Sequence, residues 1–366
     1  MIRKVKIIGA GSIGNHLAHA SRTLGWEVDL CDIDLLALER SRKEIYPSRY
    51  GKWDEKIRLF HSKDVPIGEY DLIIIGTPPD MHIPLAIKAL EERPKAIIIE
   101  KPICGPNLYG AQEMYELASE LGVAVFVGYD HVVGKASCLA LNIAKNELLG
   151  RVSTLDVEFR EHWGGIFSAH PWLSGPSDSY LGYSALGGGA SGEHSHAVNL
   201  WQHFAYQIGC GRISEVQATL DIVEDDKVHY DRICSINLRT DGGLTGRCLQ
   251  DVVTNPSRKW ARIQYENGYI EWHCGYQLGV DFVTAELPGK IKLDQFVRKT
   301  RPEDFIEELI HIESMLDSTP ENSPIALQRG LDTMLVLAAV HLSHNSGRRV
   351  KIDYSKGYDL KAISTI

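Results

Sequence analysis

The residues best suited to chemistry near the N-terminus form the segment Gly9-Ala10-Gly11-Ser12-Ile13-Gly14. The segment fits GxGxxG, follows the apolar run KVKII and precedes a helical pattern. In such a turn Gly9 permits the bend, Gly11 lets backbone approach a pyrophosphate, and Gly14 lets the helix pack on the strand. Asp32, about 20 residues beyond, is placed to accept ribose hydroxyls and to repel a 2′-phosphate. A glycine-rich turn without a ligand is the alternative, but Asp32 favours a dinucleotide site for NAD over NADP.

Two further loops follow apolar runs whose carboxyl ends lie where open α/β sheets bind ligands. In the first loop, Thr77 is placed to hydrogen-bond the cofactor, and Pro78 fixes the backbone beside it. His82 is either a cofactor contact or a cap or surface residue of a first helical turn. In the second loop, Lys101 is the best-placed hydrogen-bond donor for the alkoxide that develops when an alcohol gives up a hydride. Glu100 either orients Lys101 at the cofactor edge or caps a turn.

A third candidate segment runs from Gly187 to Trp201 and contains GGGASGEHSHAVNLW. If the segment is helical, Glu193, His196, Asn199 and His203 share one face at about 100° per residue. We expect His196 to be a general base and Glu193 to assist it, with Asn199 contacting the substrate. A hydrogen-bonded helix histidine is the alternative for His196.

A bound metal is a competing interpretation of the same region, because several histidines gather there. On a helix, however, His194 and His196 point about 200° apart, whereas helical metal pairs favour i, i+4 spacing. On a strand the two rings would share a face, so the argument depends on the helix. We therefore predict no metal.

The segment after residue 161 mixes Trp163, His170 and Trp172 with glycine and serine. It is too polar for a core element and is typical of a loop that covers a sugar ring, with aromatic faces for stacking. A contact between subunits is the alternative.

The elements that must position these residues divide the chain in two. Short apolar runs alternate with helical patterns up to about residue 128, which predicts an α/β Rossmann domain with a parallel doubly wound sheet over 1–128. Strand-like segments separated by turns follow, with hairpin signals at 241–243 and 267–268. We therefore expect an α+β domain with a mostly antiparallel sheet over 129–366, and a buried helix at 325–346 that packs between the domains. Strands are expected at 5–8, 28–31, 72–75, 96–99, 123–127, 153–159, 215–222, 232–239, 244–251 and 262–265, and further helices at 13–24, 35–46, 82–92, 107–121 and 302–316.

Composition restricts the class of protein. The 366 residues carry a formal net charge of −9, which argues against a nucleic-acid or anionic-membrane surface. The 7 cysteines lack CxxC spacing and suit free thiols in a reducing compartment. No apolar run approaches a membrane span, and no secretory signal pattern opens the chain. We expect a cytoplasmic protein with no membrane or nucleic-acid partner.

The motifs resemble those of the glucose–fructose oxidoreductase/inositol dehydrogenase (Gfo/Idh/MocA) family. The matching residues are GAGSIG at 9–14, TPPDMH at 77–82, EKP at 100–102, a glycine-rich segment with a histidine at 187–196, and SGRRV at 346–350. The resemblance implies a large open sheet in the C-terminal domain, a homodimer or homotetramer, and sugars, cyclitols or sugar nucleotides as substrates. It also implies that Tyr129 and His131 contact the substrate.

The chain departs from the family at two positions. The family has an Asp four residues before its catalytic histidine and usually another three residues after it, where this chain has Gly192 and Asn199. We expect an NAD-dependent oxidoreductase acting on a secondary hydroxyl. The alternatives are an enzyme that uses tightly bound NAD transiently for epimerisation or elimination, and a non-catalytic NAD-binding regulator.

Overall fold

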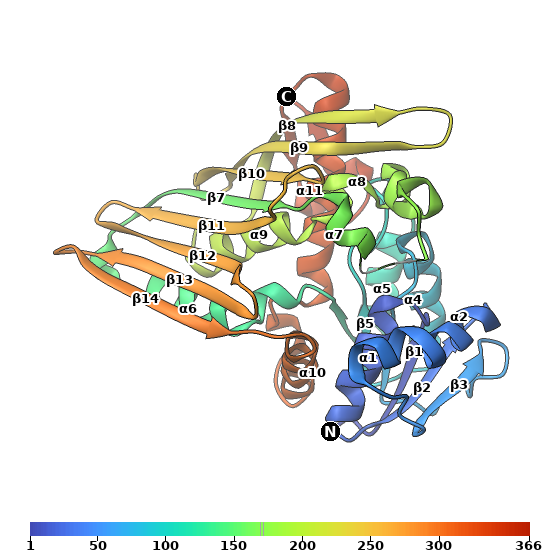
Figure 1. Ribbon diagram of the computed structural model, residues 1–366. Coiled ribbons are helices and arrows are strands. Elements are labelled where there is room, and N and C mark those ends of the chain that lie inside the picture. Colours follow the sequence, from blue (N-terminus) through green and yellow to red (C-terminus); the bar gives the residue numbers. More distant parts are fainter. Residues whose placement is uncertain (169, 171) are drawn as a thin grey trace. The chain divides into compact units, whose positions relative to one another are not determined.

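The chain folds into two compact units, and the computed structural model describes residues 1–168, 170 and 172–366. The first unit contains 1–104, 110–130 and 301–330; the second contains 105–109, 131–300 and 331–366. Figure 1 shows the chain coloured from the N-terminal to the C-terminal end. Residues 301–330 thus belong to the first unit although they follow the long antiparallel strands of the second.

The first unit is built on a six-stranded sheet in which every neighbouring pair is parallel. Its strand order is β3-β2-β1-β4-β5-β6, so the order reverses between β1 and β4. The runs Leu72–Ile75 and Ala96–Ile99 are buried along their whole length, as expected for strands covered on both faces. The strands are β1 (Lys4–Ile8), β2 (Glu27–Asp32), β3 (Ile57–His61), β4 (Leu72–Ile75), β5 (Ala96–Ile99) and β6 (Ala124–Val127).

The prediction of a parallel doubly wound sheet is confirmed, with two differences in its elements. The strands predicted from the sequence do not include β3. In this edge strand, of sequence IRLFH, only one residue is fully buried. The helix expected at 35–46 is a short α-helix followed by a π-helical turn and a second helix. The helices of this unit are α1 (Ser12–Thr23), α2 (Leu35–Arg40), η1 (Ser41–Ile45), α3 (Tyr46–Tyr50), α4 (His82–Glu91), α5 (Ala111–Leu121) and α10 (Glu303–Leu316).

The second unit is built on a ten-stranded sheet of order β14-β13-β12-β11-β7-β10-β9-β8-β15-β16. The pair β7 and β10 is parallel, and the other described pairs are antiparallel. The mostly antiparallel open sheet is therefore confirmed. Its strands are β7 (Val152–Arg160), β8 (Ile213–Glu224), β9 (His229–Thr240), β10 (Thr245–Asp251), β11 (Arg258–Tyr265), β12 (Gly268–Gln277), β13 (Val280–Leu287), β14 (Ile291–Arg298), β15 (Val350–Ile352) and β16 (Ile363–Thr365).

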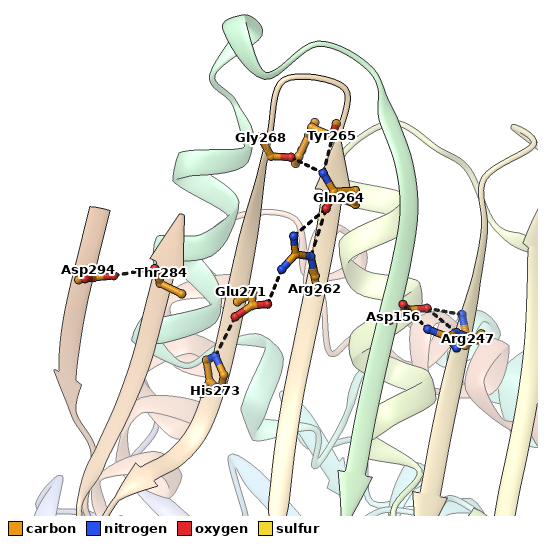
Figure 2. Close-up of polar contacts among 10 residues, drawn as sticks. All are labelled: Asp156, Arg247, Arg262, Gln264, Tyr265, Gly268, Glu271, His273, Thr284 and Asp294. Carbon is orange, nitrogen blue, oxygen red and sulfur yellow. Dashed lines mark hydrogen bonds and ion pairs between the residues drawn. The ribbon is translucent and has the colours of Figure 1, made fainter. Parts of the chain in front are cut away.

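Helices cover one face of this sheet, and polar side chains occupy the other. Along β7, Leu155, Val157 and Phe159 are buried while the residues between them are partly exposed. Trp201 of α9 is fully buried on the apolar face, where its Nε1 donates to the Leu155 carbonyl at 2.9 Å. The opposite face carries polar contacts such as those of Asp156 with Arg247 (Figure 2). The remaining helices are α6 (Lys135–Ala144), α7 (Trp163–Ser168), α8 (Gly189–Glu193), α9 (His196–Gln207) and α11 (Leu327–Ser346).

Both hairpin signals are confirmed, since 241–243 joins β9 to β10 and 266–267 joins β11 to β12. In the described part of the chain, no helix combines the length and apolarity that crossing a bilayer requires.

Candidate functional site

The glycine loop of the first unit needs glycine at two positions for purely steric reasons. Gly9 has φ +108, and a Cβ there would lie 2.7 Å from the Gly76 carbonyl oxygen. A Cβ on Gly14 would lie 1.9 Å from the Gly9 carbonyl oxygen. Gly9 therefore makes the turn, and Gly14 lets α1 lie against it, as the motif predicts.

Gly11 is different, because a Cβ built there meets no protein atom within 4 Å. Packing therefore does not demand glycine at this position, whereas close approach of a ligand to the backbone would. The loop opens α1, whose first N–H groups have no partner within the helix and attract anions. Ile13 packs over Gly76, with its Cγ2 3.6 Å from the ideal Cβ position there. The residues present fit a dinucleotide pyrophosphate.

Arg49 of α3 adds a positive charge that the motif does not predict. Its Nη1 donates to the Ser12 carbonyl at 2.9 Å and its Nη2 to Ser12 Oγ at 2.8 Å. Arg49 lies 37 positions from Ser12, and no local pattern marks it. The guanidinium thus lies beside the expected pyrophosphate position.

Asp32 is fixed at the carboxyl end of β2. Its Oδ2 accepts the Ala10 N–H at 2.8 Å and its Oδ1 accepts the Asp34 N–H at 2.9 Å. Asp34 itself caps α2 by accepting the Leu36 N–H. Each Asp32 oxygen keeps a further lone pair for a ribose hydroxyl.

His82 is a buried link between the two predicted cofactor loops. Its Nε2 lies 2.6 Å from the Thr77 carbonyl oxygen and its Nδ1 lies 2.9 Å from the Pro102 carbonyl oxygen. Burial lowers the pKa of His82 to about 4, although both carbonyls favour the protonated ring. The surface-residue alternative is therefore wrong: each ring nitrogen faces a backbone carbonyl, and the neutral ring donates its single N–H to one of the two. Thr77 and Pro78 precede this link at the carboxyl end of β4.

The EKP loop places Lys101 beside a group of buried carboxylates. Burial raises the pKa of Glu100 to about 7, with Lys101 opposing the shift and Asp130 adding to it. Glu308 of α10 is 1 % exposed, and neither of its carboxylate oxygens has a hydrogen-bond partner. Burial and the nearby charges of Glu100, Asp130 and Asp304 raise the pKa of Glu308 well above its ordinary value. Local sequence does not reveal this group, because α10 lies some 200 residues from the EKP loop.

In the second unit, the glycine-rich segment forms a tight turn around a buried carboxylate. Asp231 accepts the Ser191 N–H at 2.7 Å and the hydroxyls of Ser184 and Ser191, both at 2.9 Å. Burial raises the pKa of Asp231 to about 6, and these hydrogen bonds limit the shift. Gly189, at φ +75, leaves no room for a side chain, because its Cβ would lie 2.2 Å from Asp231 Oδ1.

The same turn explains the departure at Gly192. A Cβ on Gly192 would lie 2.0 Å from the Gly187 carbonyl oxygen, so the backbone here excludes every side chain, aspartate included. The helix that follows is interrupted. Glu193 ends α8, whereas His196 begins α9, so the prediction of one continuous polar stripe is wrong.

His196 lies in an aromatic cluster on the helix-covered face of the sheet. Its ring centroid is 4.7 Å from that of His131 and 6.1 Å from that of Phe159, on which it stacks. His131 also contacts Trp272 and accepts from Lys299 Nζ at 3.3 Å. The structure therefore brings together His131 and His196, two of the predicted site residues of this unit.

Three other predicted residues of this unit have different partners. Tyr180 donates to Glu193 Oε2 at 3.5 Å. Asn199 is buried, and its amide donates to Thr333 Oγ1 at 3.1 Å, which ties α9 to α11. His203 is buried, and burial lowers its pKa to about 3, so its expected place in an open polar stripe is wrong.

The aromatic segment is partly helical, because Trp163 opens α7. Trp163 Nε1 donates to Tyr230 Oη at 3.4 Å, and the half-buried His170 and Trp172 pack edge to face. Part of the predicted loop, residues 169 and 171, lies outside the described residues. Tyr129, in the first unit, is fully buried.

Comparisons with known proteins agree with this architecture. Residues 3–129 match the model of an oxidoreductase family with an NAD-binding Rossmann fold. No curated protein matches the chain in a sequence comparison.

Solved structures match nearly the whole chain at low identity. An oxidoreductase from Agrobacterium radiobacter, in complex with NAD+, L-tartaric acid and magnesium, is 18% identical with a TM-score of 0.74, over 96% of this chain and 98% of that one. The WlbA dehydrogenase from Bordetella pertussis, with NADH and UDP-GlcNAcA, is 18% identical with a TM-score of 0.69, over 95% and 98%. Levoglucosan dehydrogenase, with NADH and levoglucosan, is 16% identical with a TM-score of 0.73, over 95% and 98%.

These similarities show the fold of the whole chain, while the family match rests on its first domain. The predicted resemblance is thereby confirmed over residues 3–129, which match the Gfo/Idh/MocA family of oxidoreductases with an NAD-binding Rossmann fold.

Proposed function

We propose that this chain is an NAD-dependent oxidoreductase that moves a hydride between the nicotinamide and a secondary hydroxyl of a sugar, a cyclitol or a sugar nucleotide. The observation that carries the proposal is the open space at Gly11, at the start of α1, in a domain of an NAD-binding oxidoreductase family. The sugar and sugar-nucleotide ligands of two similar structures support the substrate class.

Four residues would hold the cofactor in the first unit. The backbone at Gly11 and Ser12 would hold the pyrophosphate, and Arg49, which donates to Ser12, would contribute a cation there. Asp32 receives the ribose hydroxyls and disfavours a 2′-phosphate, so NAD is preferred over NADP. When bound, the nicotinamide supplies the hydride acceptor.

Lys101 is the proposed donor to the substrate oxygen. An ammonium group there stabilises the negative charge that develops on the oxygen as its proton leaves. Glu100, behind it in the same loop, accepts the Lys101 backbone N–H at 3.3 Å.

His196 is the proposed general base. A neutral imidazole on the first residue of α9 can take the hydroxyl proton, and its aromatic neighbours limit ring rotation. Glu193 assists as a nearby carboxylate. Gly192 cannot carry the family's aspartate, so the base function rests on the imidazole and its surroundings. His131, Trp163, His170 and Trp172 are the proposed substrate contacts, whereas Tyr129 is fully buried and offers no surface to a ligand.

The proposal is tested on the purified protein. NAD binding is measured by calorimetry, and sugars, cyclitols and sugar nucleotides are screened for formation of reduced nicotinamide by absorbance. Net accumulation of NADH supports a dehydrogenase. A substrate that changes without net reduction would instead support transient use of tightly bound NAD in epimerisation or elimination. Binding of NAD with no change in any compound of these classes would favour a regulator.

Matched substitutions test the residue roles. Lys101→Met and His196→Asn are each expected to lower kcat by at least about 100-fold while NAD affinity stays within threefold. Lys88→Met and His229→Asn are the controls, because both side chains are exposed and are expected to leave turnover unchanged. Full activity of either site variant would contradict its assignment.

A further inference from the structure

A chain of charged and titratable groups leads from the interior of the second unit to His196. It begins at Asp281, on the buried face of β13, whose Oδ1 accepts the Gly275 N–H at 2.8 Å. Lys299 Nζ lies 3.9 Å from Asp281 Oδ2 and 3.3 Å from His131 Nδ1. The His131 ring then contacts His196, at 4.7 Å between centroids.

The Lys299 side chain is held rather than mobile. Its backbone N–H donates to the Gly279 carbonyl at 2.9 Å, which ties the end of β14 to the β12–β13 turn. The side chains of Lys299 and Asp281 are only 19% and 6% exposed. A buried carboxylate with a single lysine beside it keeps that ammonium charged, because separating the pair would leave an uncompensated charge.

Ammonium chemistry then fixes the tautomer of His131. Lys299 Nζ carries three donors and no acceptor, so the lone pair of His131 Nδ1 must face it. A proton on Nδ1 would set two donors against each other at 3.3 Å, and in the imidazolium form it would also set two positive charges against each other. His131 is therefore neutral, with its proton on Nε2.

Uncharged aromatic rings surround the pair of imidazoles. Phe159 of β7 stacks on His196 and packs edge to face on His131 at 5.3 Å, and Trp272 of β12 lies 5.9 Å from His131. Both rings are buried. Neither Phe159 nor Trp272 carries a charge, and the low polarity of these rings strengthens the effect of Lys299 on the pair.

We propose that Asp281, Lys299 and His131 form a positioning relay for His196, in which the Lys299 ammonium holds His131 as the neutral Nε2–H tautomer and disfavours protonation of His196, the general base. None of the three relay residues reacts with the substrate in this role. The inference deepens the proposed function and rests on it for the role of His196.

Two carboxylates oppose the effect of Lys299. Asp281 neutralises part of the ammonium charge, and Asp130 precedes His131 in the chain. Lys299 touches the His131 imidazole directly, whereas Asp281 acts through the ammonium, and both carboxylates remain in place when only the lysine is replaced. Removal of the lysine charge should therefore make protonation of the imidazole pair easier.

The first test does not depend on activity. Side-chain ¹⁵N spectra of histidine-labelled protein, assigned with His131→Asn and His196→Asn, report the tautomer and charge of each ring. Neutral His131 with Nε2–H between pH 6 and 8 is expected, and in Lys299→Met the pair should become protonated at a pH about one unit higher. A charged or Nδ1–H His131, or unchanged titration in Lys299→Met, would overturn the relay.

The second test uses turnover, with controls for folding. The acid limb of the kcat/KM profile of Lys299→Met should move up by about one pH unit, a loss of about tenfold at low pH, and Lys299→Arg should restore it. The double variant Lys299→Met/Asp281→Asn removes both charges and guards against a buried, unpaired carboxylate. Lys292→Met, on the exposed part of β14, should match the wild type.

The two tests distinguish failure of the relay from failure of the proposed function. If the spectra behave as expected but no sugar-like alcohol is oxidised, the proposed function fails while the relay geometry stands. An unshifted acid limb in an active Lys299→Met enzyme would overturn the relay alone.

Discussion

His82 and Pro102 join the two cofactor loops of the Rossmann domain, with His82 Nδ1 2.9 Å from the Pro102 carbonyl oxygen. The other ring nitrogen contacts the Thr77 carbonyl oxygen, so one buried side chain determines the spacing between the loop after β4 and the loop that carries Lys101. This link explains a polar, fully buried residue next to an otherwise apolar sheet.

The first prediction follows from this link. His82→Phe keeps an aromatic ring but removes the imidazole N–H, so the backbone carbonyl that accepts it loses its partner, and we expect a loss of about 1–3 kcal/mol in the free energy of unfolding. NAD affinity should fall with it, because both loops are expected at the cofactor. Denaturant unfolding and calorimetry measure the two effects. His229→Phe, at an exposed position, is the control, and an unchanged stability of His82→Phe would show that the link is dispensable.

The second prediction concerns the buried carboxylates behind Lys101. The pKa of Glu308 is raised well above its ordinary value, and the pKa of Glu100 is raised to about 7. The folded protein therefore binds more protons than the unfolded chain above about pH 4.5. Stability from these groups is therefore complete below about pH 4.5 and is lost as pH rises through the folded pKa values. We expect Glu308→Gln to raise the melting temperature at pH 8 and to matter little at pH 4.5.

Thermal unfolding across this pH range checks the sign, with Glu321→Gln as the exposed control. Buried histidines act oppositely at lower pH, because burial lowers the pKa of His203 to about 3 and that of His341 to about 4. The stability that these histidines contribute is lost as pH falls below about 6.5. The test therefore compares the melting temperatures of variant and wild type at each pH. A Glu308→Gln variant that is less stable at pH 8 would contradict the argument.

The third prediction addresses the missing aspartate. Because a Cβ on Gly192 would overlap the Gly187 carbonyl, Gly192→Asp cannot restore the family's side chain and should cost more than about 3 kcal/mol of stability. Gly192→Ala should be similarly damaging, since the clash begins at Cβ. Gly175→Ala is the control, because its Cβ meets nothing within 4 Å. A stable and more active Gly192→Asp enzyme would show that the turn around Asp231 can rearrange.

Much of the fold follows from local pattern, while much of the site does not. The runs at 72–75 and 96–99 are wholly apolar and were placed correctly, and the glycine loop was placed with its helix. The expected strands do not include β3, β12, β13, β14, β15 or β16; of these, the edge strand β3 and the exposed strand β14 show no clear apolar alternation.

The site residues that sequence did not reveal act across long separations. Arg49 reaches Ser12, Asp231 holds the turn at Ser191 from 40 positions away, and Lys299 reaches His131 from 168 positions away. A motif records neighbours in sequence, whereas these contacts depend on how strands pair and helices pack. The break between α8 and α9 has the same origin, since the turn at Gly187–Gly192 closes around Asp231.

The fourth prediction separates the two roles of glycine in the dinucleotide loop. Gly11→Ala adds a methyl group that meets no protein atom, so the melting temperature should stay within about 2 °C of the wild type. The methyl group would occupy space that the pyrophosphate needs, so the Kd for NAD should rise at least about tenfold, or 1.4 kcal/mol. Gly14→Ala should instead lower the stability of the protein without NAD, because its Cβ overlaps the Gly9 carbonyl. Any loss of NAD affinity in this variant would then follow from the destabilised domain. Thermal unfolding with and without NAD, beside NAD titration of both variants, distinguishes these outcomes. If Gly11→Ala bound NAD as tightly as the wild type, the pyrophosphate would not lie against this part of the loop, and the cofactor site proposed here would have to move.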